Sequence, residues 1–234
     1  MKAVILCGGF GTRFSEETKT KPKPMVSIGK FPILFHILKI YEKHGINEFI
    51  LALGYKGRVI ENFFNKKNLL KFNSIYARHL NKKPQKLNWK IQFCYSGLNT
   101  MTGGRLLRLK KYLIKEKNFL LTYGDGLANV DIKKLIRFHK KHKKIGTVTA
   151  VIPSARFGAL NLIGQKVKSF QEKPQSGEGW INGGFFCFQN RIFEYLKNDK
   201  TILEKQPLTN LAKNKNLHAY KHYKYWQCMD TRRD

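Results

Sequence analysis

The chain has 234 residues, of which 42% are hydrophobic and 13% aromatic, so it is long and apolar enough to bury a sizeable core. No apolar run approaches the roughly 20 residues that a membrane-spanning helix needs. The N-terminus leads straight into a strand pattern rather than a secretory leader. We therefore expect a cytoplasmic globular protein that makes no contact with a membrane.

The net charge is +30, from 45 Lys and Arg against 15 Asp and Glu. Such an excess is typical of nucleic-acid binding, or of a lysine-rich chain that acts on anionic substrates. The densest basic stretches, 133–144 and 213–224, interleave lysine with apolar residues, as solvated faces of helices and strands do. Because no nucleic-acid-reading motif occurs, we expect no nucleic-acid partner, and keep a basic nucleic-acid binder as an alternative.

Cysteine and histidine do not indicate a zinc site. Four cysteines lie in or beside apolar runs, none in a Cys-x-x-Cys spacing: Cys7, Cys94, Cys187 and Cys228. We interpret them as reduced thiols in or near the core rather than as disulfides or zinc ligands.

Two histidine pairs have spacings that would suit zinc on a helix, His139 with His142 and His218 with His222. No third ligand is near either pair, so we place them on solvated faces.

Strand patterns alternate with amphipathic helix patterns through the first 150 residues. In chain order they are a strand at Val4–Leu6, a helix at 31–45, a strand at 48–54, a helix at Gly57–Phe72, a strand at Ile91–Tyr95, a helix at 105–116, a strand at 119–123, a helix at Ile132–Lys143 and a strand at Thr147–Ile152. This alternation predicts an α/β fold with three layers, in which helices cover both faces of a mostly parallel sheet.

After Pro153 the pattern changes to shorter elements. Strand-like runs occur at Ala159–Leu162, Val167–Gln171 and Trp180–Phe188, and helices are predicted near Ile192–Lys197 and Leu203–Lys213. No linker, repeat or low-complexity segment separates the two regions. We therefore predict a single domain over residues 1–234 with a β-rich C-terminal part.

A glycine-rich loop, 8-GGFGTRFSEETKTKPKPM-25, follows the first predicted strand. It does not fit the dinucleotide fingerprint G-x-G-x-x-G, because Phe14 stands at the third glycine position and no carboxylate occurs in residues 24–32. It does not fit the phosphate loop G-x-x-x-x-G-K-[ST] either. The common dinucleotide oxidoreductases and nucleotide triphosphatases are thereby disfavoured.

The loop is nevertheless suited to phosphate. Its glycines let backbone N–H groups approach a ligand closely. Arg13 offers a fork of donors to phosphate oxygens. Lys23 stands between Pro22 and Pro24, which limits the freedom of the backbone that carries its ammonium group. Two cations and several amides together indicate a triphosphate site.

The loop resembles the signature of the sugar-1-phosphate nucleotidyltransferases, also called sugar-nucleotide pyrophosphorylases. The similarity extends along nearly the whole chain, through 54-GYKG-57, 101-MTGGRL-106, 123-YGDG-126, 156-RFGAL-160, 170-FQEKP-174, 181-INGGFF-186 and 229-MDTRRD-234. MTGGRL, RFGAL and the early SEET are typical of the cytidylyl branch. The resemblance implies the Rossmann-like fold of nucleotide-diphospho-sugar transferases, with CTP and α-D-glucose 1-phosphate as substrates and CDP-glucose and pyrophosphate as products.

The resemblance also implies which residues bind each substrate. Residues at about 1–150 would form the nucleotide-binding part, with contacts from Leu6, Cys7, Gly8, Gly9, Phe10, Gly11, Thr12, Arg13, Lys23, Thr100, Met101, Thr102, Gly103, Arg105, Gly124 and Asp125. Residues at about 151–234 would bind the sugar phosphate through Gly158, Ala159, Glu172, Lys173, Asn182, Gly183 and Gly184. For Arg105, the alternative is an exposed arginine in the first turn of a helix.

Two aspartates are the expected metal ligands. Asp125 ends a predicted strand between two glycines, and Asp230 follows the aromatic run 223-YKYW-226. Mg²⁺ binds through one or two carboxylates and substrate phosphates, and the resemblance implies that these two aspartates hold it. It further implies that Arg13, Lys23 and Asp125 are catalytic, with Arg13 at the β/γ-phosphates and Lys23 bridging phosphates in the transition state. Without the resemblance, Asp125 would suit a turn or a helix cap equally well.

Several positions depart from the family pattern. Cys7 replaces a small apolar residue, Cys228 stands where relatives commonly have proline, and Lys30 interrupts a glycine pair. The sequence ends with 229–234, where relatives continue with a segment that supports assembly, so we expect that this segment is lacking. From the family resemblance we still expect a homo-oligomer. A uridylyl- or thymidylyltransferase remains an alternative. A binding protein without catalysis is disfavoured, because a pure binder needs no pair of metal ligands.

Overall fold

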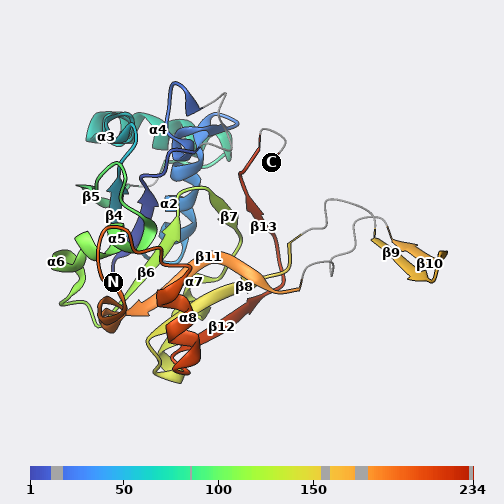
Figure 1. Cartoon of the computed structure of the whole chain (residues 1–234). Helices are drawn as coiled ribbons and strands as arrows, with labels where there is room; N and C mark the ends of the chain where they lie inside the picture. The colour runs from blue at the N-terminus through green and yellow to red at the C-terminus, as the bar shows by residue number, and fades with distance from the viewer. Residues whose placement is uncertain (12–17, 85, 154–158, 172–178, 232–233) are drawn as a thin grey trace.

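The computed structural model of the chain describes residues 1–11, 18–84, 86–153, 159–171, 179–231 and 234 (Figure 1). A seven-stranded sheet in the order β12-β8-β11-β6-β1-β4-β5 lies at its centre. Its strands are β1 (Ala3–Cys7), β4 (Glu48–Leu53), β5 (Lys90–Tyr95), β6 (Asn118–Tyr123), β8 (Gly146–Val151), β11 (Ile181–Gln189) and β12 (Leu217–His222). Strand β11 is antiparallel to both of its neighbours, and the other pairings are parallel. The predicted α/β fold with a mostly parallel sheet is confirmed.

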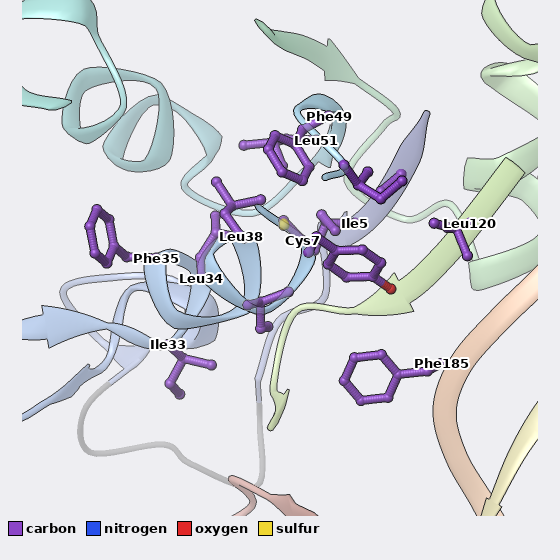
Figure 2. Close-up of a cluster of buried hydrophobic side chains, with 14 of the residues drawn as sticks. Ile5, Cys7, Ile33, Leu34, Phe35, Leu38, Phe49, Leu51, Leu120 and Phe185 are labelled. Atoms are coloured by element: carbon purple, nitrogen blue, oxygen red, sulfur yellow. The ribbon is translucent and has the colours of Figure 1, made fainter. Parts of the chain in front are cut away.

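Helices cover both faces of the sheet, as predicted. One face carries α2 (Ile33–Lys43), α3 (Gly57–Phe63), α4 (Lys66–His79) and α7 (Ile132–His142). The other carries α5 (Thr102–Arg108), α6 (Lys110–Leu113), the 3₁₀ helix η3 (Asn190–Tyr195) and α8 (Gln206–Lys213). Alternate residues of β1 serve the two layers, because Ile5 and Cys7 join one buried cluster and Leu6 joins the other. Figure 2 shows the first cluster, where Leu34 and Leu38 of α2 lie over β1.

One 3₁₀ helix and three two-stranded pairs complete the described chain. The 3₁₀ helix η2 (Lys23–Met25) follows the glycine loop, and β2 (Ser27–Ile28) pairs with β3 (Phe31–Pro32). Strands β9 (Ala159–Ile163) and β10 (Lys166–Gln171) form a hairpin that stands apart from the sheet in Figure 1. Strand β7 (Gly126–Ala128) pairs antiparallel with β13 (Trp226–Cys228). This last pair joins the end of β6 to the C-terminal region.

Three predicted helices differ from those observed. The helix expected over Gly57–Phe72 is two helices, because Asn65 caps α4 by accepting a 2.9 Å hydrogen bond from Asn68 N. The helix expected over 105–116 begins three residues earlier, at Thr102, and is divided at Leu109. The helix expected near Ile192–Lys197 is the 3₁₀ helix η3. Within the described ranges, no helix combines the length and the apolar character required to span a bilayer.

The interpretation of the histidines as solvated residues is wrong for His139 and His222, which are both buried. His139 lies with Thr147 Oγ1 2.8 Å from its Nδ1 and Asn118 Oδ1 3.0 Å from its Nε2. Burial, helped by the neighbouring His142, lowers the pKa of His139 to about 4. The many lysines around His139 in the sequence suggested an exposed helix face, whereas His139 lies on the face of α7 that packs against the sheet.

Candidate active site

A cleft of about 730 Å³ opens at the carboxyl ends of β1 and β6. These strands are adjacent, and the chain continues from β1 to β4 and β5 on one side and returns to β6 on the other. Ligands of open α/β sheets bind at such a reversal of strand order, outside the carboxyl ends of the strands. The cleft therefore occupies the position at which this topology favours binding.

Most of the residues predicted to bind substrates line this cleft: Leu6, Cys7, Gly8, Gly9, Phe10, Gly11, Lys23, Thr100, Met101, Thr102, Arg105, Gly124, Asp125, Asn182, Gly183, Gly184 and Asp230. Gly103 instead lies in α5 with its Cα facing Thr201 and Leu203, where no side chain would fit. Ala159 begins β9, in the separate hairpin. The predictions made for Thr12, Arg13, Gly158, Glu172 and Lys173 lie outside the described residues.

Arg105 supports the glycine loop through a hydrogen bond from its buried guanidinium to Gly8 O. Its side chain is buried, and its guanidinium donates hydrogen bonds to Gly8 O (2.8 Å), Gly97 O (2.7 Å), Leu98 O (3.1 Å), Leu53 O (3.3 Å) and Ser96 Oγ (2.8 Å). These acceptors belong to segments that line both sides of the cleft, so one cation ties the loop after β1 to the loop after β5. The alternative of an exposed helix arginine is wrong.

Replacing Arg105 by lysine is expected to destabilise the protein by about 1–3 kcal/mol, because a compact ammonium leaves some of these buried carbonyls without a donor. The KM for CTP, the nucleotide that the resemblance implies, should rise as the glycine loop loses its support. Urea unfolding and steady-state kinetics measure the two effects. Arg108→Lys is the matched control, since Arg108 lies on the surface and pairs with Asp199. An Arg105→Lys protein as stable as this control would contradict the assignment.

Lys23 lies between the two predicted metal ligands. Its Nζ is 2.7 Å from Asp125 Oδ2 and 2.7 Å from Asp230 Oδ1. Burial alone would lower the pKa of Lys23, but the Asp125 carboxylate, with help from Asp230, outweighs burial and raises it. The lysine therefore stays charged. Its backbone is held in η2, where Pro22 O accepts a 2.8 Å hydrogen bond from Met25 N.

Asp125 and Asp230 are brought together by the pairing of β7 with β13. Cys228 of β13 lies opposite Gly126 of β7, and Met229 N donates a 2.9 Å hydrogen bond to Asp125 O. Oxygen atoms of the two aspartates and the sulfur of Cys228 all lie within 4.8 Å of one another. Two carboxylates at this separation form a donor set that fits a hard divalent cation.

The thiol of Cys228 is protonated in this setting. Burial, and then the charges of Asp125 and Asp230, raise the pKa of Cys228 to about 12. The four cysteines are free, and the other three are buried. The structure shows no disulfide between the four cysteines, and Cys228 differs from the other three because it faces the cleft beside both carboxylates.

Glu204 connects the two halves of the cleft. It accepts a 2.6 Å hydrogen bond from Thr102 Oγ1 and a 2.5 Å hydrogen bond from the hydroxyl of Tyr123. Burial and the Glu204 charge raise the pKa of Tyr123, so its phenol keeps the proton that it donates. Asn182 Nδ2 in turn donates to the Tyr123 oxygen at 3.3 Å. The network thus runs from a predicted nucleotide residue to a predicted sugar residue.

Glu204→Gln is expected to raise the KM for glucose 1-phosphate, the sugar phosphate that the resemblance implies, about fivefold, which corresponds to roughly 1 kcal/mol. A glutamine amide has one acceptor oxygen where the carboxylate has two, so Asn182 loses part of its support. Initial rates at varied sugar phosphate measure the effect. Glu194→Gln is the control, since Glu194 pairs with Arg191 on the surface. An effect no larger than the control's would contradict a positioning role for Glu204.

Several residues of the cleft were not predicted from the sequence: Pro24, Leu98, Asn99, Thr122, Tyr123, Gly126, Glu204, Trp226 and Cys228. For some of them the sequence offered a clue, because they adjoin residues that were predicted. Tyr123 and Gly126 flank 124-GD-125, and Trp226 ends an aromatic run before Asp230. Trp226 Nε1 donates to Gly183 O at 2.8 Å and so connects β13 to the first residues of β11. Glu204 had no signal, because it lies in an unremarkable polar stretch after Leu203.

The comparisons with known proteins agree with this geometry. Residues 2–230 match the model of the family described as nucleotidyl transferase. The chain is 47% identical over 242 residues to the glucose-1-phosphate cytidylyltransferase of Salmonella typhimurium, covering 100% of this chain and 93% of the relative. It is also 47% identical over 236 residues to a probable glucose-1-phosphate cytidylyltransferase of Bacillus subtilis, covering 99% and 92%.

A solved structure extends the likeness to three dimensions. The crystal structure of HddC from Yersinia pseudotuberculosis superposes with a TM-score of 0.70 at 26% identity, over 99% of this chain and 95% of that protein. The match of the family model covers nearly the whole chain, and the matches to these two relatives cover 99% of this chain or more. The chain therefore belongs to the nucleotidyl transferase family, in the same group as the glucose-1-phosphate cytidylyltransferases.

Proposed function

We propose that the chain transfers the cytidylyl group of CTP to α-D-glucose 1-phosphate, giving CDP-glucose and pyrophosphate. The observation that carries the proposal is the 47% identity, over the full length of this chain, to a glucose-1-phosphate cytidylyltransferase. The cleft supports it, because a glycine loop, a charged lysine and two carboxylates meet at the carboxyl ends of β1 and β6.

The reaction is an in-line displacement. An oxygen of the sugar phosphate attacks the α-phosphorus of CTP, and the bond from that phosphorus to the pyrophosphate oxygen breaks. The nucleophile is already an anion, so the site needs no strong base. It needs to hold two anions together and to stabilise the charge that develops on the leaving group.

Each residue of the cleft has a place in this proposal. Backbone amides of the glycine loop face the triphosphate, and Lys23 donates to phosphate oxygens as the leaving group gains charge. Asp125 and Asp230 would hold a divalent cation, which we propose to be Mg²⁺ and which supplies positive charge against the phosphates when bound. Asn182 and the backbone around Gly184 face the sugar. The roles of Arg13, Glu172 and Lys173 stay predictions.

Pyrophosphate release tests the proposal. The chain is incubated with glucose 1-phosphate, Mg²⁺ and each of CTP, UTP, dTTP, ATP and GTP in turn. A preference for CTP supports the proposal through to the base. Faster release with UTP or dTTP would replace the cytidylyl assignment by the uridylyl or thymidylyl alternative. No release with any nucleotide, from protein shown to be folded, would contradict the proposed substrates.

We also propose that the chain forms a homo-oligomer, as the resemblance implies. The charge of +30 opposes association at low ionic strength, and screening at about 0.15 M salt weakens that repulsion. Light scattering at both salt concentrations measures the mass. A single-chain mass at both would contradict the proposal.

A further inference from the structure

Cys228 is held beside the two carboxylates by the backbone. It ends β13, directly opposite Gly126, the residue that follows Asp125. The hydrogen bond from Met229 N to Asp125 O holds the residue that follows β13 against the same loop. Strand pairing therefore fixes the backbone of Cys228 beside Asp125, and its short side chain places the sulfur close to both carboxylates.

The distances suit one shared ion. Sulfur and carboxylate ligands lie roughly 2.0–2.3 Å from a bound Zn²⁺. The sulfur of Cys228 and one oxygen each of Asp125 and Asp230 lie within 4.8 Å of one another, so they reach a shared ion with little movement. Lys23 now balances the two carboxylates at 2.7 Å from each. A bound cation would neutralise the two carboxylates in place of Lys23. The Lys23 ammonium could then turn to the phosphates of the substrates.

We propose that Cys228 is a third ligand of this cation site and gives it a preference for thiophilic divalent ions such as Zn²⁺ and Co²⁺ over Mg²⁺. The inference rests on the proposed metal role of Asp125 and Asp230. As the sulfur–metal bond forms, the thiol proton leaves to solvent, so the ligand is a thiolate. Thiolates select ions such as Zn²⁺, whereas Mg²⁺ takes oxygen ligands and keeps its waters.

Cobalt provides the test, because a thiolate bound to Co²⁺ gives a charge-transfer band in the near ultraviolet. Co²⁺ is titrated into the full chain without nucleotide. We expect this band with the wild type and its loss in Cys228→Ser, together with Co²⁺ binding weakened by roughly 10–100-fold or more, since even the outer partners of metal ligands contribute that much. The affinity for Mg²⁺, measured by calorimetry, should be the same in both proteins.

Two cysteine variants serve as controls. Cys94→Ala removes a buried thiol on β5 and should keep the band. Cys7→Ala removes the other thiol that lines the cleft and should also keep it. A band that persists in Cys228→Ser, a band that disappears in Cys7→Ala, or Co²⁺ binding without any band would each overturn the proposal.

The pyrophosphate assay separates this inference from the proposed function. A cobalt band that depends on Cys228, in a protein that releases no pyrophosphate with CTP, would support the ligand assignment and contradict the substrates. Normal release with CTP and Mg²⁺, in a protein that binds Co²⁺ no better than Cys228→Ser does, would overturn the ligand and leave the function in place.

Discussion

Asp125→Asn is expected to reduce the kcat of pyrophosphate release by on the order of 10³, because a cation that polarises phosphoryl oxygens contributes several kcal/mol to the transition state. An amide carries no charge, so raising the Mg²⁺ concentration should not restore the rate. The substitution also removes one of the two ion pairs of Lys23 and keeps the ion pair with Asp230. Steady-state rates across a Mg²⁺ titration, with thermal unfolding to show an intact fold, measure the effect.

Asp131→Asn is the matched control. Asp131 caps α7 by accepting a 2.9 Å hydrogen bond from Lys134 N, and asparagine caps a helix equally well. The control should keep both its stability and its rate. Activity of Asp125→Asn close to that of Asp131→Asn would defeat the assignment of Asp125 as a metal ligand.

Lys23→Ala is expected to lower kcat by roughly 10²–10³, the usual loss when one donor is removed from a preorganised site. The donor acts mainly on charge that develops as pyrophosphate leaves, so the KM for glucose 1-phosphate should change much less than kcat. Without the ammonium, Asp125 and Asp230 also repel each other in the free protein. Rates at varied CTP and varied sugar phosphate separate the two constants.

Lys30→Ala removes an exposed lysine at the turn between β2 and β3 and is the control for overall charge. Its kinetics should match the wild type. If Lys23→Ala raised the KM for glucose 1-phosphate and kept its kcat, Lys23 would belong to the sugar-phosphate side of the cleft rather than to the triphosphate.

The alternation of strands and helices up to β8 was predictable, because each buried strand is a short apolar run and each helix repeats its apolar residues at helical spacing. Two of the predictions that failed depend on particular polar contacts. Asn65 starts α4 through one capping hydrogen bond, directly after α3 has ended. His139 points inward because Thr147 and Asn118 offer partners from the sheet. Neither contact is visible from local periodicity.

The family was recognisable from motifs that lie at the ends of strands, and the comparisons confirm it. The glycine loop and 124-GD-125 both follow buried parallel strands, and parallel strands bring their carboxyl ends to one edge of the sheet. The meeting of Lys23 with Asp125 could be expected on that basis, although 102 positions separate them. The roles of these residues in the reaction stay predictions.

The sequence by itself determined which segments form strands, which loops carry glycine and charge, and the family to which the chain belongs, because these depend on local pattern and on motif. Only the tertiary structure decided which side chains share the cleft. Pairing of β13 with β7 places Cys228 beside Asp125, and the antiparallel β11 brings Asn182 to the end of β6. Glu204 and Arg105 join segments far apart in the chain. Such contacts depend on long-range register and burial, which no local pattern records.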